Sequence, residues 1–306
     1  MSRYGLPYMG SKNQIAEWVV DKLPKATHFY DLFCGGCSIT HCAITKNKYK
    51  YYHINDINPY IPNIFIDAIN GKYNNDYRWI SHEDFDKLKG KGDALVDLCF
   101  SFGNNYKKGY AYSKDIEPFK KATHYAICLC KFDLINGILG DNELELLANI
   151  PSIEKRYSIF KSNIIKRVSN KQIITNKRIQ ELRSLECLES LQRLERLQSL
   201  EPIATIGDYQ DIKIEDDSVI YCDIPYFNTE SYNDSESFDY ERFYSWAEKQ
   251  KNIFISEYWM PKDRFRCIDM ISKLSILSAS NNSLKRVEKL FIPINNEYTP
   301  TQLTLF

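Results

Sequence analysis

The chain has 306 residues, of which 43% are hydrophobic and 14% aromatic, enough for one full α/β domain and a smaller second domain. Its 40 basic and 40 acidic residues cancel, so net charge alone does not indicate a nucleic-acid partner. The sequence contains neither a signal peptide nor an apolar run of membrane-spanning length. These observations argue against an integral membrane protein, and we expect a cytoplasmic location.

The nine cysteines do not have the spacing of a structural zinc site. Cys34 and Cys37 form one CxxC, but no second CxxC completes a set of four ligands. We therefore interpret the thiols as reduced and mostly buried, and expect no bound metal.

The first predicted element is an amphipathic helix that follows the segment Pro7 to Gln14 and is stopped by Pro24. Its apolar face consists of Ile15, Trp18, Val19 and Leu23. A strand from His28 to Asp31 then runs into the small residues that end at Cys37, where glycine allows a ligand to approach the backbone. Ser38 is predicted to cap a helix from Ile39 to Lys46.

The next strand, Tyr51 to Asn55, ends at Asp56 and precedes a helix from Asn58 to Asn70. Asp56 lies 21 positions after Gly35, close to the spacing of about 20 at which an acid reaches ribose hydroxyls in a nucleotide-binding βαβ unit. NAD would suit the same geometry, but the Gly-x-Gly-x-x-Gly fingerprint is absent after Gly36. The pattern favours a nucleoside ligand without a pyrophosphate.

Mostly helical spacing continues from Asp76 to Ile153, broken by residues 101–110. This break contains Lys107 and Lys108 and offers donors for base edges and phosphates, although a plain loop explains it equally well. From Lys155 to Arg178, eight Lys or Arg occur without any acid, and they include Lys166 and Arg167. Such a run suits phosphate contacts, with a solvated surface helix as the alternative.

A leucine recurs at every third position from Leu182 to Leu200. On an α-helix this spacing drifts by about 60° per step, so the leucines form no single stripe. A 3₁₀-helix would align them, but such helices rarely exceed a few residues. We interpret Ile179 to Glu201 as a helical connector that ends near Pro202, with an oligomer contact as the alternative.

The strand from Ser218 to Cys222 precedes the turn Asp223-Ile224-Pro225-Tyr226. The turn should therefore lie at the carboxyl edge of a sheet, where open α/β sheets bind ligands. Asp223 and the Ile224 carbonyl would accept hydrogen bonds from an exocyclic amine, and the Tyr226 ring would stack on a flat base. Alone, the tetrapeptide is equally typical of an ordinary turn after a strand.

The last elements are a helix from Tyr240 to Lys249, a strand from Ile253 to Ser256, and an antiparallel pair formed by residues 275–277 and 290–293. The strand ends in Glu257-Tyr258-Trp259-Met260-Pro261. Its aromatic residues could wall a base pocket, and core packing is an equal alternative for Trp259.

Four segments together resemble the Dam-like, α-type adenine-specific DNA methyltransferases. Residues 223–226 resemble their Asp-Pro-Pro-Tyr signature, with Ile224 in place of the first proline. The segment from Asp31 to Cys37 resembles the S-adenosylmethionine loop, with Cys37 where the family usually has Gly. Gly10 and Lys12 match the amino-terminal Gly-Gly-Lys element, and residues 206–209 resemble the Gly-Asp-Phe segment. The order of the segments is also that of the family.

The resemblance implies an α/β fold, namely a Rossmann-like class I methyltransferase sheet with an inserted, mostly helical target-recognition domain. The catalytic domain would comprise residues 1–74 and 202–306, the target-recognition domain 75–178 and the connector 179–201. Residues 227–232 resemble the family's loop after the catalytic turn. We expect a monomer or a weak dimer.

The implied activity is base flipping in double-stranded DNA and methylation of adenine. A cognate restriction endonuclease is a further partner that the resemblance suggests. Catalysis would use Asp223, Ile224, Pro225 and Tyr226. DNA would contact Lys107, Lys108, Lys166 and Arg167. S-adenosylmethionine would contact Tyr8, Gly10, Lys12, Asp31, Phe33, Gly35, Gly36, Asp56, Asp208 and Tyr209. The alternative is a catalytically inactive DNA-binding module with the same fold.

Overall fold

The computed structural model describes residues 3–8, 10–135, 141–171, 182–227, 238–274 and 285–298. The chain divides into two compact units. One contains Lys72–Arg193 together with Pro7–Met9, and the other contains Ser2–Leu6, Gly10–Gly71 and Leu194–Phe306. We call them the helical unit and the sheet unit, and describe each by itself.

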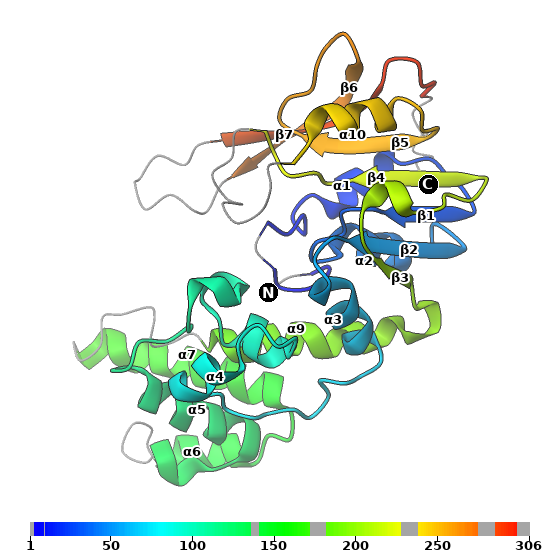
Figure 1. The fold of residues 1–306 in the computed structure, drawn as a ribbon. Coiled ribbons are helices and arrows are strands. Elements are labelled where there is room, and N and C mark those ends of the chain that lie inside the picture. The colour runs from blue at the N-terminus through cyan, green and yellow to red at the C-terminus, as the bar shows by residue number, and fades with distance from the viewer. Residues whose placement is uncertain are drawn as a thin grey trace, which may run out of the picture. The chain divides into compact units, whose positions relative to one another are not determined.

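The sheet unit is built on seven strands in the order β3-β2-β1-β4-β5-β7-β6 (Figure 1). Strands β1 to β5 pair in parallel and β7 pairs antiparallel with β5 and β6. This is the α/β Rossmann-like architecture that the sequence predicts. The strands are β1 (His28–Asp31), β2 (Tyr51–Asp56), β3 (Ile203–Ile206), β4 (Ser218–Cys222), β5 (Ile253–Glu257), β6 (Phe265–Leu274) and β7 (Lys285–Pro293).

The order of the strands reverses between β1 and β4, which lie side by side although β2 and β3 come between them in sequence. In an open α/β sheet such a reversal leaves a crevice at the carboxyl ends of the two strands. Asp31 is opposite Tyr221 in the β1–β4 register. The loop after Asp31 and the turn after Cys222 therefore leave the sheet at the same edge.

The helices of the sheet unit are α1 (Ala16–Lys22), α2 (Ser38–Thr45), α3 (Tyr60–Ile69) and α10 (Tyr240–Ala247). Every residue of β4 and β5 is buried, as expected for strands covered on both faces. Phe243, Tyr244 and Ala247 of α10 pack in one core cluster with Ile220 and Ile253 from these strands.

Two predictions about local structure are wrong. Ser38 does not cap α2 but is its first residue, and Cys37 occupies the cap position without a side-chain cap bond. Strand β6 begins at Phe265, where no strand was predicted, and extends to Leu274 with a bulge between Cys267 and Asp269. The predicted strand 275–277 lies outside the described residues, whereas residues 290–293 form the end of β7.

The helical unit contains α4 (His82–Leu88), α5 (Glu117–Leu129), α6 (Asp141–Ala148), α7 (Ile153–Lys171) and α9 (Arg183–Gln192), as Figure 1 shows. Trp79, Phe100 and Tyr112 contact one another in its interior. The mostly helical character predicted for this region is confirmed. Its role in target recognition stays a prediction.

The leucine repeat is not a single α-helix. It begins in α9, where Leu185, Leu188 and Leu191 are buried, and continues as an eight-residue 3₁₀-helix, Arg193–Leu200. We expected 3₁₀-helices to be too short to align the leucines of this repeat. This one is long enough to place Leu194 and Leu197 on the same face, and both are buried. The two units divide between Arg193 and Leu194, one residue after the helix type changes.

All nine cysteines lie among the described residues and are free, seven of them buried. Within the described ranges, no helix is both long and apolar enough to cross a membrane. The same part of the chain contains no group of three or more His, Cys, Asp or Glu side chains that could hold a metal ion.

Candidate functional site

The turn Asp223 to Tyr226 follows β4 directly and is anchored on two sides. Ile224 is buried in the core cluster, which explains why a large apolar residue is accommodated there. The Pro225 carbonyl accepts a hydrogen bond of 2.9 Å from the Tyr240 hydroxyl of α10. The side chains of Asp223 and Tyr226 are thereby presented from a fixed backbone.

Asp223 forms an ion pair with Lys12, with 3.0 Å between Lys12 Nζ and Asp223 Oδ1. Burial raises the pKa of Asp223, and the Lys12 ammonium opposes that rise. Burial would lower the pKa of Lys12, but the carboxylates of Asp223 and Glu288 outweigh it and raise the pKa. Lys12, assigned to the cofactor from its sequence, thus lies on the predicted catalytic carboxylate.

The Tyr226 ring lies among Lys12, Tyr258 and Glu288. Its hydroxyl donates a 2.6 Å hydrogen bond to Glu288 Oε2, and Lys12 Nζ is 4.3 Å from the ring centroid. The Tyr258 ring meets it edge-on at 4.4 Å. Sequence reasoning missed Glu288, which is buried in β7, because the surrounding charged and apolar residues form no motif.

Asp31, at the end of β1, is buried and only half satisfied. Its Oδ2 accepts a hydrogen bond of 2.7 Å from Thr40 Oγ1, whereas Oδ1 has no hydrogen-bond partner among the described residues. Burial raises the pKa of Asp31 to about 7. A buried acceptor without a partner is costly, and a ligand N–H group would satisfy it.

Gly35 and Asp56 connect the loop after β1 to the end of β2. Gly35 N donates a hydrogen bond of 2.9 Å to Asp56 Oδ2, while Asn58 N donates one of 2.9 Å to Oδ1. Each carboxylate oxygen can accept a further bond, so a ligand hydroxyl can still bind Asp56. Among the described residues other than its chain neighbours, none has an atom within 4 Å of the position that a Cβ on Gly35 would occupy. Beside Asp56, Ile57 is 77% exposed and offers an apolar surface.

The amino-terminal segment lies against this loop at Gly5, which sequence analysis did not single out. Gly5 has a φ of 69°, and a Cβ atom there would clash with Gly36 O. Leu6 N donates a 2.6 Å hydrogen bond to Gly36 O, and the hydroxyls of Ser11 and Ser38 are 2.7 Å apart. The segment thereby brings Lys12 to the site.

The other predicted cofactor residues differ in their surroundings. Gly10 is exposed with a φ of 85°, and Tyr8 belongs to the helical unit. Phe33 packs against Tyr209, with 5.2 Å between the ring centroids, so both contribute to the core. Asp208 forms an ion pair of 2.7 Å with Arg242. Their roles in binding the cofactor stay predictions.

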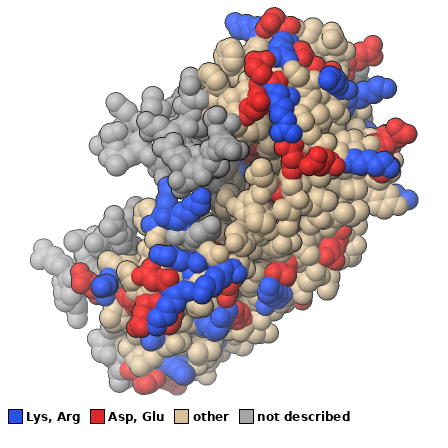
Figure 2. Space-filling model, viewed as in Figure 1, with Lys and Arg blue, Asp and Glu red and all other residues tan. Residues whose placement is uncertain are grey.

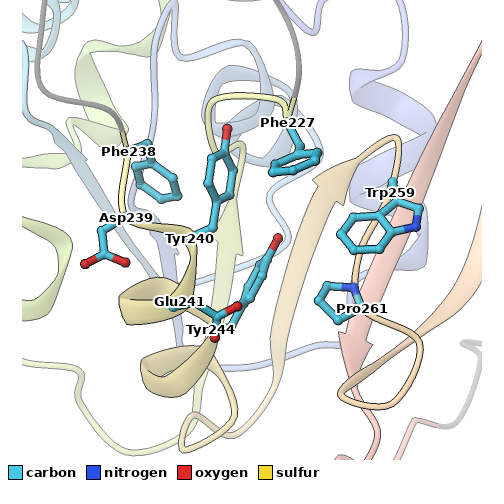
Figure 3. Close-up of a pocket in the computed structure, with 8 residues that line it drawn as sticks. All are labelled: Phe227, Phe238, Asp239, Tyr240, Glu241, Tyr244, Trp259 and Pro261. Atoms are coloured by element: carbon cyan, nitrogen blue, oxygen red, sulfur yellow. The ribbon is translucent and has the colours of Figure 1, made fainter.

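A pocket of about 530 Å³ lies beside the turn from Asp223 to Tyr226, between α10 and the loop after β5 (Figure 3). Trp259 is 49% exposed and lines this pocket, so core packing does not account for it. The lining residues are Phe227, Phe238, Asp239, Tyr240, Glu241, Tyr244, Trp259 and Pro261. Residues 228–232 of the predicted post-catalytic loop lie outside the described residues.

The predicted DNA-binding residues lie in the helical unit. Lys107 and Lys108 are exposed in a 3₁₀ turn, Tyr106–Lys108, and a bridge between Ser101 and Tyr110 closes the surrounding loop. Lys166 and Arg167 belong to α7, and their side chains lie outside the described part of the chain. Figure 2 shows basic side chains together with acidic ones on the described part of the visible face.

A sequence model of the D12 class N6 adenine-specific DNA methyltransferases matches residues 8–266. The matched range contains the loop after β1, the turn from Asp223 to Tyr226 and the helical unit from Lys72 onward, but ends before β7 and Glu288. Comparison with curated protein sequences gives no significant match.

Proposed function

Because the chain belongs to the D12 class N6 adenine-specific DNA methyltransferases, we propose that it transfers a methyl group from S-adenosylmethionine to an adenine flipped out of double-stranded DNA. The observation that carries this proposal is the location of Asp223. Its carboxylate lies at the sheet edge where β1 and β4 end side by side, and the loop after β1 has an open backbone and an unsatisfied acid.

The residues of that loop fit S-adenosylmethionine. The unpaired Asp31 Oδ1 suits the ammonium group of a methionine moiety, and Asp56 suits ribose hydroxyls. The exposed Ile57 and the open backbone at Gly35 suit a flat base and close approach. When bound, the cofactor would supply an electrophilic methyl group on its sulfonium sulfur. We assign Tyr8, Gly10, Lys12, Phe33, Gly36, Asp208 and Tyr209 to the same site.

Asp223 and the Ile224 carbonyl would hold the amino group of the target adenine. Lys12 faces Asp223 Oδ1, so we assign Oδ2 to the amine. Two acceptors on one amino group draw its nitrogen toward tetrahedral geometry and make its lone pair available. Positioning of this kind supplies much of the rate. The methylated nitrogen is then acidic enough to lose its proton to water, so Asp223 need not remove a proton first.

Tyr226 would stack on the flipped base, a contact of roughly 1–3 kcal/mol in proteins that bind single strands. Lys12 lies over one face of the ring. A stacked base therefore uses the opposite face or displaces the ammonium. Pro225 contributes by fixing the turn between the two side chains.

We further propose that the helical unit contacts DNA through Lys107, Lys108, Lys166 and Arg167. The exposure of Lys107 and Lys108 and the acid-free basic run on α7 support this assignment. A catalytically inactive DNA-binding module is not favoured, because the matched family consists of adenine methyltransferases.

The test is the N6-methyladenine content of plasmid DNA from cells that express the protein. Wild-type protein should methylate one sequence, and Asp223→Ala should reduce methyl transfer by orders of magnitude, because one of two amine acceptors is lost. Binding of S-adenosylmethionine should survive in Asp223→Ala. Asp263→Ala, which changes an exposed carboxylate, should retain wild-type activity. Near wild-type transfer by Asp223→Ala would mean that the active site lies elsewhere.

A further inference from the structure

Glu257, the last residue of β5, is a buried carboxylate that binds the backbone on both sides of the site. Its Oε2 accepts a hydrogen bond of 3.0 Å from Phe227 N, and its Oε1 accepts one of 2.6 Å from Tyr258 N. The residue is 1% exposed. Phe227 follows the catalytic turn directly, and the ring of Tyr258 contacts that of Tyr226. One side chain thus binds the backbone of Tyr258 and that of Phe227, the residue after Tyr226.

The sheet itself does not hold the turn in this place. The pairing of β4 with β5 ends at Cys222 and Ile255, so residues 223–227 extend beyond the ladder. The Tyr240 hydroxyl on Pro225 O attaches the turn to α10, and Glu257 attaches it to β5. Without Glu257, the carboxyl end of the turn would lose its attachment to β5.

A buried carboxylate such as Glu257 is a costly choice for a residue with a purely structural role. The hydrogen bonds to Glu257 come from neutral backbone N–H groups, so they satisfy the carboxylate without neutralising its charge. Burial raises the pKa of Glu257 to about 7, although the backbone hydrogen bonds oppose that rise. Buried ionisable groups of this kind concentrate at functional sites, because a well-packed apolar residue would be less costly elsewhere.

We propose that Glu257 is a positioning residue for methyl transfer, because its carboxylate fixes the turn that carries Asp223 and Tyr226 against the end of β5. The inference rests on the function proposed above. Two acceptor oxygens are required, since Phe227 N binds Oε2 while Tyr258 N binds Oε1. A glutamine offers one acceptor and replaces the other with a donor.

The experiment compares Glu257→Gln with wild-type protein, using plasmid DNA from a host that lacks adenine methylation. We expect kcat to fall by about 10- to 100-fold, because small displacements of reacting groups have effects of this order. The dissociation constant for S-adenosylmethionine should change much less. Glu257→Asp retains two acceptors on a shorter side chain and should recover part of the lost kcat. Glu297→Gln changes an exposed carboxylate that does not line the pocket beside the turn, and should keep wild-type kcat.

An unchanged kcat in Glu257→Gln would overturn the proposal. A variant that loses cofactor affinity and thermal stability together with kcat would also overturn it, because such a general loss indicates a purely structural role. If the variants do not fold, amide hydrogen exchange of the wild-type protein decides the question. The Phe227 amide should be protected although it lies outside every helix and strand, and rapid exchange would contradict the proposal. A wild-type protein that transfers no methyl group but protects this amide would instead indicate that the proposed function is wrong.

Discussion

At the scale of single residues, the candidate site combines carboxylates that burial makes unfavourable. The pKa values of Asp31, Asp223 and Glu257 are all raised by burial. A core under selection for stability alone would avoid such groups, because each costs free energy in its charged form. Their arrangement around one edge of the sheet is therefore consistent with selection for ligand binding and catalysis.

Asp31 should make the stability of the protein depend on pH. Its folded-state pKa of about 7 lies above the ordinary value, so between about pH 4 and pH 7 the folded state binds a proton more readily than the unfolded state. The free energy of unfolding should therefore fall as pH rises through this window. Asp31→Asn has no carboxyl group at this position and therefore lacks this pH dependence. The difference in unfolding free energy between wild type and Asp31→Asn should change across the window by an amount on the order of a few kcal/mol.

Urea denaturation at a series of pH values measures the effect of Asp31→Asn. Asp263→Asn, at an exposed site, should follow the wild-type curve. We also expect weaker binding of S-adenosylmethionine by Asp31→Asn, because the unpaired acceptor is replaced by a donor. Parallel stability curves for wild type and Asp31→Asn would show that the carboxylate is not protonated in the folded protein.

Lys12 should control the ionisation of Asp223. The Lys12 ammonium lowers the pKa of this carboxyl group, so its removal in Lys12→Met should raise that pKa further. Methyl transfer requires ionised Asp223 and should fall at neutral pH, on the order of tenfold for each pH unit by which the pKa lies above the assay pH. Activity should recover toward alkaline pH. The pH dependence of kcat is the measurement, and Lys213→Met, at an exposed lysine, is the control. A profile with the wild-type midpoint would exclude this role.

At the scale of elements, the site depends on how the carboxyl ends of β1, β2 and β3 and the start of α2 meet. The loop after β1, the end of β2 and the Gly207 segment after β3 are joined by the bonds Gly35 N to Asp56 Oδ2 and Gly207 N to Asp56 O. Cys37, at the start of α2, has a φ of 55°. Glycine adopts a positive φ without strain. This explains why the S-adenosylmethionine loop that residues 31–37 resemble usually has glycine at the position of Cys37.

The helix α7 should bind phosphates, since its basic run contains no acid. Replacing Lys166 and Arg167 with Ala should weaken binding to all DNA duplexes about equally, and should reduce the slope of log affinity against log salt concentration by about 2. The salt dependence of binding to specific and unrelated duplexes measures this effect. In the control, Lys87 and Lys89 are replaced, because each already pairs with an acid. A loss restricted to one DNA sequence would instead show that α7 reads bases.

At the scale of the whole molecule, the sheet unit contains all proposed cofactor residues except Tyr8. The protein should therefore bind S-adenosylmethionine in the absence of DNA. Calorimetry should give the same dissociation constant with and without a metal chelator, because the described residues contain no group of three or more His, Cys, Asp or Glu side chains that could hold a metal ion. Loss of binding in the chelator would contradict this prediction, and binding only in the presence of DNA would place part of the site on the helical unit or on the DNA itself.

The sequence by itself determined the family, the α/β fold and the order of the functional segments. These properties are encoded locally. Apolar strands followed by Asp31, Asp56 and Asp223 can be recognised because each acid follows its own strand. Parallel strands then place these acids at one edge whatever the details of packing. The match to adenine methyltransferases over residues 8–266 confirms the predicted family.

Only the tertiary structure showed how the groups at that edge pair with one another. Lys12 meets Asp223 across 211 positions of sequence, Glu288 meets Tyr226 across 62, and Glu257 meets Phe227 across 30. None of these pairs has a local signature, because hydrogen bonds and ion pairs form wherever packing brings donor and acceptor together. Gly5 is a further example. A side chain at this position would clash with the carbonyl oxygen of Gly36, which belongs to another segment of the chain. Local patterns specify strands and their ends, and packing between distant segments decides which side chains meet there.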